Sequence, residues 1–257
     1  MPDVILSDLR SGTLVVTLNR PAVLNAVSRA VREALIARLS AAEADPAVKA
    51  VIITGAGKAF SAGQDLAEAA AVEATDIRPW CDSIRAMYQS VRALSKPTIA
   101  AFNGIAAGAG MQIGLCADLR ITHASARIGQ PEVKAGLASI VGSYLMSLYV
   151  GHGANRELSL SGGLISGEQA FALGLVNRIV PEGEVLDTAL MFAEELRRVP
   201  HAAFRLTKQR FREQTQPGFD EATAYGVRAM LEAYATGEPQ RVRRAFVEAR
   251  AQRKGKG

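Results

Sequence analysis

The sequence predicts an α/β fold followed by a helical C-terminal region. Through about residue 180, short runs of β-branched and apolar residues alternate with segments of helical periodicity. From Glu184 onward the periodicity is helical throughout. A chain of 257 residues that is 49% hydrophobic and 21% charged can bury a large core without disulfides. We therefore expect an α/β core over residues 1–183 and a helical region over residues 184–257.

Four segments of the first region are expected to be strands because they are short, apolar and rich in β-branched residues: 14–18, 48–54, 98–102 and 119–122. Ser28 is placed to cap a helix that runs to about Ala44. A second helix is expected over residues 77–94, and Pro97 follows its end. The C-terminal region is expected to hold four helices, at 185–199, 202–213, 221–235 and 239–250.

Composition excludes several classes of protein. Cys81 and Cys116 lie far apart, and the three histidines lack metal-ligand spacing, so we expect neither a disulfide framework nor a metal site, as suits the cytoplasm. The longest apolar stretch, residues 98–114, is too short and too interrupted by glycines for a membrane span. The net charge is +5, but no nucleic-acid-reading motif accompanies it. The basic residues gather at the C-terminal end, where they either form a solvated tail or attract an anionic, phosphate-rich ligand.

Two glycine- and alanine-rich loops, residues 54–66 and 103–114, share one pattern. Each follows an expected buried strand and opens a helix, where free N–H groups attract negative charge. Two such loops could supply two donors to one developing oxyanion, which is a large catalytic contribution. Tight packing of a helix against a sheet explains the small residues equally well.

Three other interpretations remain open on the residues alone. Gly108–Gly114 resembles a dinucleotide-binding glycine pattern, but it lies too far along the chain. The segment around Ser61 approaches the nucleophile elbow of serine hydrolases, although no histidine or acid is evidently placed to serve it. A non-catalytic protein that only binds coenzyme A esters would keep both loops.

Motifs spread over residues 14–250 resemble the enoyl-CoA hydratase/isomerase (crotonase) family. These motifs are Leu18-Asn-Arg-Pro21 with Leu24-Asn-Ala26, Lys58–Leu66, Lys96–Gly104 with Ala106–Gly110, Cys116–Arg120, Gly129-Gln-Pro-Glu132, Ala170–Val176 and Ala245-Phe-Val-Glu248. The resemblance implies a crotonase-like spiral of ββα units, a helical trimerisation region, and a homotrimer or dimer of trimers. It also implies an acyl-CoA thioester substrate that carries its own coenzyme A, with no separate cofactor.

The resemblance further implies the roles of individual residues. The backbone N–H groups of Gln64 and Ala109 would form the oxyanion hole, and Glu132 would be the acid/base. The coenzyme A and acyl contacts would come from Ala22, Val23, Leu24, Ala62, Gly63, Asp65, Leu66, Gly108, Ile140 and Phe246.

Two departures from the family pattern bear on the reaction. Hydratases of the family usually carry a second glutamate where this chain has Gln112, whose amide orients groups but cannot exchange a proton at neutral pH. Eight residues after Glu132, where the family usually has a glycine, this chain has Ile140, which narrows the space for a catalytic water. One glutamate suffices to shift a double bond, so hydration of a 2-enoyl-CoA and isomerisation of an enoyl-CoA are close competitors.

Overall fold

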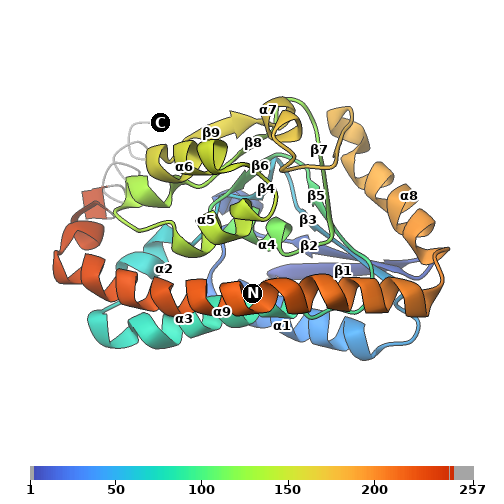
Figure 1. The fold of residues 1–257 in the computed structure, drawn as a ribbon, viewed down its shortest axis with the longest axis horizontal. Coiled ribbons are helices and arrows are strands. Elements are labelled where there is room, and N and C mark those ends of the chain that lie inside the picture. The colour runs from blue at the N-terminus through green and yellow to red at the C-terminus, as the bar shows by residue number, and fades with distance from the viewer. Residues whose placement is uncertain (1–2, 243, 246–257) are drawn as a thin grey trace.

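The computed structural model describes residues 3–242 and 244–245. Its centre is a six-stranded sheet in the order β1-β2-β3-β5-β7-β10, with a four-stranded sheet, β4-β6-β8-β9, beside it (Figure 1). The strands of the large sheet are β1 (Ile5–Arg10), β2 (Thr13–Leu18), β3 (Ala50–Gly55), β5 (Thr98–Phe102), β7 (Leu119–Thr122) and β10 (Arg178–Ile179). Apart from the β1–β2 hairpin, all its pairs are parallel.

The small sheet is built from short strands that follow the strands of the large one. They are β4 (Ala59–Ser61), β6 (Ile105–Ala107), β8 (Arg127–Gly129) and β9 (Leu164–Ser166). β4, β6 and β8 run parallel, and β9 is antiparallel to β8. From β3 to β8, consecutive strands alternate between the two sheets with a helix between pairs, which is the ββα spiral that the family resemblance implies.

Helices surround the two sheets. They are α1 (Arg29–Ala44), α2 (Leu66–Ala70), α3 (Ile77–Arg92), α4 (Ala109–Leu115), α5 (Ile140–Ser147), α6 (His152–Ser161), α7 (Gly167–Ala172), α8 (Val185–Arg197) and α9 (His201–Ala235), with 3-10 turns at Pro21–Val23, Ala74–Asp76, Pro131–Ala135 and Glu182–Glu184. α8 packs its buried alanines, Ala189 and Ala193, against one face of the large sheet. α9 lies across α3 and α5 (Figure 1).

The predicted strands at 98–102 and 119–122 are confirmed to the residue, and those at 14–18 and 48–54 within two residues. The Ser28 cap is also confirmed, since its side chain accepts from the Val31 N–H. The strands β1, β4, β6, β8, β9 and β10 and the helices α4 to α7 were not predicted as separate elements.

The prediction of separate helices at 202–213 and 221–235 is wrong, because α9 is continuous over 35 residues. Pro217 lies inside it and removes one backbone donor. At this point α9 packs against α5, and the Tyr144 hydroxyl donates to the Thr215 carbonyl oxygen at 2.6 Å. Gly218 permits this contact, since a Cβ there would lie 2.6 Å from the Tyr144 ring. The expected helix at 239–250 falls mostly outside the described residues.

Within the described part of the chain, no helix combines the length and apolar character needed to cross a membrane. No group of three or more histidine, cysteine, aspartate or glutamate side chains is clustered there as metal ligands would be.

Candidate active site

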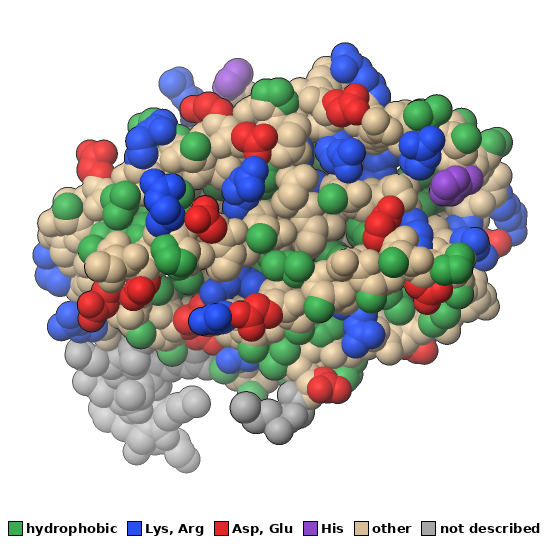
Figure 2. Space-filling view, turned by 90° about the horizontal axis from the view of Figure 1, so that it is seen from below, with side chains coloured by type: hydrophobic (Ala, Val, Ile, Leu, Met, Phe, Trp, Pro, Cys, Tyr) green, Lys and Arg blue, Asp and Glu red, His purple; other side chains and the backbone are tan. Residues whose placement is uncertain are grey.

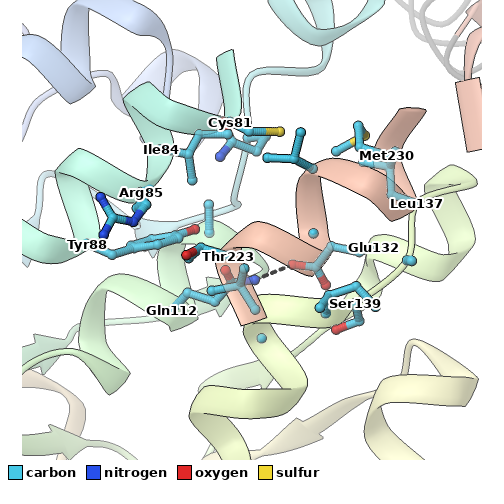
Figure 3. Close-up of a pocket in the computed structure, with 18 of the residues that line it drawn as sticks. Cys81, Ile84, Arg85, Tyr88, Gln112, Glu132, Leu137, Ser139, Thr223 and Met230 are labelled. Carbon is cyan, nitrogen blue, oxygen red and sulfur yellow. Dashed lines mark hydrogen bonds between the residues drawn. The ribbon is translucent and has the colours of Figure 1, made fainter. Parts of the chain in front are cut away.

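A pocket of about 110 Å³ opens between α3, α4, the 3-10 turn at residues 131–135, α5 and α9 (Figure 3). It brings together four of the residues singled out from sequence: Gln64, Ala109, Gln112 and Glu132. Ile140 also lines it, beside an apolar wall that includes Ile84, Val141, Val227 and Met230.

The first glycine-rich loop presents the Gln64 N–H away from the sheet. Gln64 forms a parallel bridge with Val27, in which Val27 bonds to the Gly63 carbonyl at 2.8 Å and to the Asp65 N–H at 3.1 Å. In a parallel bridge the neighbours of the paired residue make the bonds, so the N–H of Gln64 faces the other side. Gly63, with φ of +98°, makes the turn.

The second loop presents Ala109 as the first residue of α4, where the N–H has no partner within the helix. Gly108 precedes it with φ of +51°. A Cβ on Gly63 would lie 2.8 Å from the Ala107 oxygen and 3.5 Å from the Ala109 nitrogen, so the two loops are in direct contact. The N–H groups of Gln64 and Ala109 therefore line one pocket and can act on one oxygen.

Other glycines of the second loop serve packing, as the alternative interpretation held. A Cβ on Gly110 would collide with the backbone and side chain of Ser61, and one on Gly114 would lie 2.2 Å from the Phe102 ring. The glycines of the second loop thus have two roles. Gly108, just before α4, shapes the site, whereas Gly110 and Gly114, within α4, let the helix pack closely on the sheets.

Glu132 lies in the 3-10 turn at residues 131–135, and its carboxylate faces the pocket. The Nε2 of Gln112 donates to its Oε1 at 2.7 Å, the dashed line in Figure 3. Glu132 is half-buried, and desolvation of its carboxyl group in the pocket raises the pKa of Glu132 to about 7, with hydrogen bonds to its carboxylate acting in the opposite direction. At neutral pH the group can therefore either accept or give up a proton.

Gln130 is a partner of Glu132 that the sequence did not point to. Its side chain is fully buried, and Gly142 leaves room for it, since a Cβ there would lie within 2.8 Å of the Gln130 amide atoms. With its nitrogen toward Glu132, the Gln130 amide donates to the two carboxylate oxygens at 2.8 and 2.9 Å. Turned the other way, its oxygen accepts from Gln112 at 2.9 Å. The amide nitrogen can donate to the Glu132 carboxylate, and the amide oxygen can accept from the protonated carboxyl group, so Gln130 suits either protonation state of Glu132.

Ion pairs fix the first loop and α2 from outside the pocket. Asp65 caps α2 and bonds to Arg20 at 2.8 Å. Arg32, buried on α1, bonds to Glu68 at 2.6 Å and approaches the side-chain oxygen of Gln64 at 3.5 Å. Arg32, which in the sequence resembles a solvated surface residue, thus holds the loop that carries Gln64.

The expected coenzyme A segments lie next to each other. Ala22 and Val23 are in a 3-10 turn, and Leu24, with φ of +52°, accepts the Ala62 N–H at 2.9 Å. Leu66 begins α2. Leu24 is 43% exposed, so this edge beside the pocket is open to a ligand. Phe246 lies outside the described residues.

Ser61 cannot act as a nucleophile in this structure. Its side chain is fully buried, and its hydroxyl donates to the Asn25 carbonyl oxygen at 2.8 Å and accepts the Gly63 N–H at 3.2 Å. No histidine is among the described residues that line the pocket. Ser61 instead fixes the first loop.

Comparison with known proteins decides the family. A sequence profile described as enoyl-CoA hydratase/isomerase matches residues 8–255. The chain belongs to the enoyl-CoA hydratase/isomerase family. This enoyl-CoA hydratase/isomerase is 34% identical to a short-chain-enoyl-CoA hydratase of Clostridium acetobutylicum, over 92% of this chain and 91% of that protein. It is 32% identical to a crotonyl-CoA hydratase of Syntrophomonas wolfei, over 92% of each.

A crystal structure of an enoyl-CoA hydratase/isomerase from Mycobacterium paratuberculosis superposes with a TM-score of 0.88. It is 25% identical, and the match covers 95% of this chain and 99% of the other. The crotonase fold is therefore confirmed, and the chain is an acyl-CoA enzyme of this family.

Proposed function

We propose that this enoyl-CoA hydratase/isomerase adds water to a short 2-enoyl-CoA, with Glu132 as its single acid/base. The observation that carries the proposal is the half-buried carboxylate of Glu132, whose pKa desolvation raises to about 7, in the pocket lined by Gln64 and Ala109. The names of the two hydratases compared above support the choice of hydration.

In the proposed reaction, the N–H groups of Gln64 and Ala109 donate to the thioester oxygen. Water adds its oxygen to C3 and gives a proton to the Glu132 carboxylate, while the C2–C3 π electrons move toward the thioester oxygen and form an enolate. Glu132 then returns the proton to C2, and the enolate collapses to the 3-hydroxyacyl thioester. Gln112 and Gln130 orient the Glu132 carboxyl group throughout.

Isomerisation is the alternative, and the replacement of a second glutamate by Gln112 favours it. Near neutral pH, Glu132 is the titratable group of the described pocket lining, because burial raises the pKa of Cys81 to about 11 and that of Tyr88 well above its usual value. One base can remove a C2 proton from a 3-enoyl-CoA and return it at C4. Ile140 in the lining restricts the room for water.

Incubation with crotonyl-CoA and, separately, with a 3-enoyl-CoA tests the proposal. Hydration removes the absorbance of the conjugated thioester, whereas isomerisation creates it. Release of free thiol would indicate hydrolysis, and binding of both compounds without any change would indicate a coenzyme A ester-binding protein; either result contradicts the proposal.

We further propose assembly into a trimer or a dimer of trimers through the C-terminal helices, with coenzyme A entering as part of the substrate. Large apolar side chains on or next to α8 and α9 are exposed: Met191, Val199, Leu206, Phe211, Tyr225 and Leu231. The face in Figure 2 shows apolar side chains between charged ones. We expect sedimentation at micromolar concentration to give a mass of three or six times 27.2 kDa; a 27.2 kDa species would contradict the proposal.

A further inference from the structure

The pocket contains a tyrosine hydroxyl whose hydrogen bond is not supplied by the protein. Tyr88 comes from α3, is 2% exposed and lines the pocket. In Figure 3 its ring points from α3 toward the centre of the pocket, where Thr223 from α9 and Gln112 from α4 also lie. Within the described residues its hydroxyl makes no hydrogen bond, and burial raises the pKa of Tyr88, so it stays a neutral donor.

The other buried or half-buried tyrosines behave differently. Tyr144 donates to the Thr215 carbonyl oxygen at 2.6 Å, Tyr149 to that of Leu115 at 2.8 Å, and Tyr234 to that of Ala69 at 3.3 Å. Among the four buried or half-buried tyrosines, Tyr88 is the one whose hydroxyl lacks a hydrogen-bond partner within the described structure, and it is the one that faces the acyl pocket.

The groups near Tyr88 are acceptors. The Thr223 hydroxyl gives its hydrogen to the carbonyl oxygens of Phe219 and Asp220, both at 3.0 Å, so only its lone pairs remain for the pocket. Gln112 uses its amide nitrogen on Gln130 and Glu132, which leaves its amide oxygen as an acceptor. Tyr88 is thus a donor that lies beside two acceptors, Thr223 and Gln112. The indole N–H of Trp80 and the hydroxyl of Ser139 are further donors of the lining without a partner in the described structure.

We propose that Tyr88 and Thr223 select an acyl group that bears a hydroxyl beyond its reacting carbons. This inference rests on the proposed function. A hydroxyl can accept from Tyr88 and donate to Thr223 or Gln112 at once, whereas a carbonyl oxygen can only accept. A carboxylate would face these acceptors and the nearby Glu132 carboxylate, which disfavours it. Arg85, a cation of the lining, is already paired with Asp220 at 2.7 Å. The pocket of about 110 Å³ limits the chain to a short one.

Matched substrate pairs test the proposal. We would compare 4-hydroxybut-2-enoyl-CoA with pent-2-enoyl-CoA, and 6-hydroxyhex-2-enoyl-CoA with hept-2-enoyl-CoA, so that each hydroxyl is replaced by a methyl group of similar size. The wild type should prefer one hydroxylated compound by ~10–100-fold in kcat/KM, since a site built to bond a hydroxyl rejects the analogue that lacks it. Tyr88→Phe and Thr223→Val should bring the ratio close to one by slowing the hydroxylated compound, and Thr223→Ser should retain it.

Tyr144→Phe is the matched control, because Tyr144 is bonded to Thr215 outside the pocket lining. It should lower the melting temperature and leave the substrate ratio unchanged. A wild-type ratio near one would mean that Tyr88 holds only a water, and an equal loss on both compounds in Tyr88→Phe would mean a structural role; each result overturns the inference.

Failure of the proposed reaction would be distinguishable from failure of this inference. If the wild type converts neither compound, calorimetric binding of 4-hydroxybutyryl-CoA and valeryl-CoA, and of 6-hydroxyhexanoyl-CoA and heptanoyl-CoA, still compares hydroxyl with methyl. Tighter binding of a hydroxylated ester that is lost in Tyr88→Phe supports the inference without turnover, and equal binding in both pairs overturns it.

Discussion

The two loops that line the site have the same plan but are held in place by different forces. Each turns at a glycine of positive φ, Gly63 or Gly108, and presents the N–H of the next residue. The second loop continues into α4, all of whose residues are buried. The first continues into the short α2, which is fixed largely by the ion pairs of Arg20 and Arg32. Apolar packing therefore positions one donor, and charge positions the other.

The largest effect is expected at Glu132, the residue that accepts and returns the proton, rather than at either loop. Glu132→Gln keeps the side-chain volume and the loops but removes proton exchange, so turnover should fall by at least ~10²–10⁴-fold while coenzyme A ester binding persists. In the wild type, kcat/KM should rise with pH through about 7 as Glu132 ionises. Near-normal turnover of the purified variant would contradict the assignment.

The same variant should be more stable than the wild type at pH 8. The folded chain holds the Glu132 proton more tightly than the unfolded chain, so the free energy of unfolding falls as pH rises from about 4.5 to about 7. Glu132→Gln avoids this loss, which amounts to about 3 kcal/mol from the difference in pKa. Thermal melts at pH 5 and pH 8 measure it; an equal difference between variant and wild type at both pH values would contradict burial of the charge.

Gly63→Ala and Gly108→Ala each distort the turn of one of the two loops. A Cβ on Gly108 would lie 3.0 Å from the Glu132 carboxylate, and one on Gly63 would lie 2.8 Å from a backbone oxygen. Both variants should lower kcat by ~10²-fold, as expected when an oxyanion donor is displaced. Gly151→Ala is the control, since its Cβ would meet nothing within 4 Å. Steady-state kinetics with unchanged kcat in Gly63→Ala would remove the first loop from the site.

Removal of an ion pair should disturb the first loop, which is held by charge, rather than the second. Arg32→Met leaves Glu68 without its partner, although Glu68 keeps 28% of its side chain in water, so we expect a loss of about 2 kcal/mol in stability and a several-fold fall in kcat. Arg29→Met, whose pair with Glu33 is exposed, should leave stability close to that of the wild type, because water screens such a pair. Denaturant titration and kinetics of both variants decide whether the buried pair matters more than the exposed one.

The smallest change in structure is Gln112→Glu, beside the second loop. A second carboxylate next to Glu132 repels it, so one of the two should hold its proton to higher pH, by about one pH unit in the profile of kcat/KM. Hydration of crotonyl-CoA should improve, and more so with Ile140→Gly, which makes room for water. If wild-type hydration is already fast and Gln112→Glu slows it, Gln112 is not a deficit for hydration.

The contrast between the loops also explains what the sequence could predict. The second loop and the buried strands are contiguous apolar segments, so local pattern locates them. Arg32 and Glu68 are 36 residues apart, and each alone resembles a solvated surface charge. The sequence does not indicate the roles of Gln130, Tyr88 and Thr223, because these follow only from the meeting of three helices and a turn at one pocket.

The missed elements have similar causes. β4, β6 and β8 have three residues each, which is too short for a periodicity, and β1 has a largely exposed, mixed composition. The gap predicted between residues 213 and 221 contains Pro217 and Gly218, and proline and glycine disfavour helix interiors. The Tyr144 contact at this point of α9 comes from a distant segment.

The continuity of α9 makes it a rigid lever about 52 Å long, from 35 residues of helix. Leu206 and Phe211 lie exposed toward one end, and Thr223, Val227 and Met230 form a wall of the acyl pocket toward the other. One helix therefore carries both an exposed apolar surface and a wall of the acyl pocket, and no break in the helix separates the two.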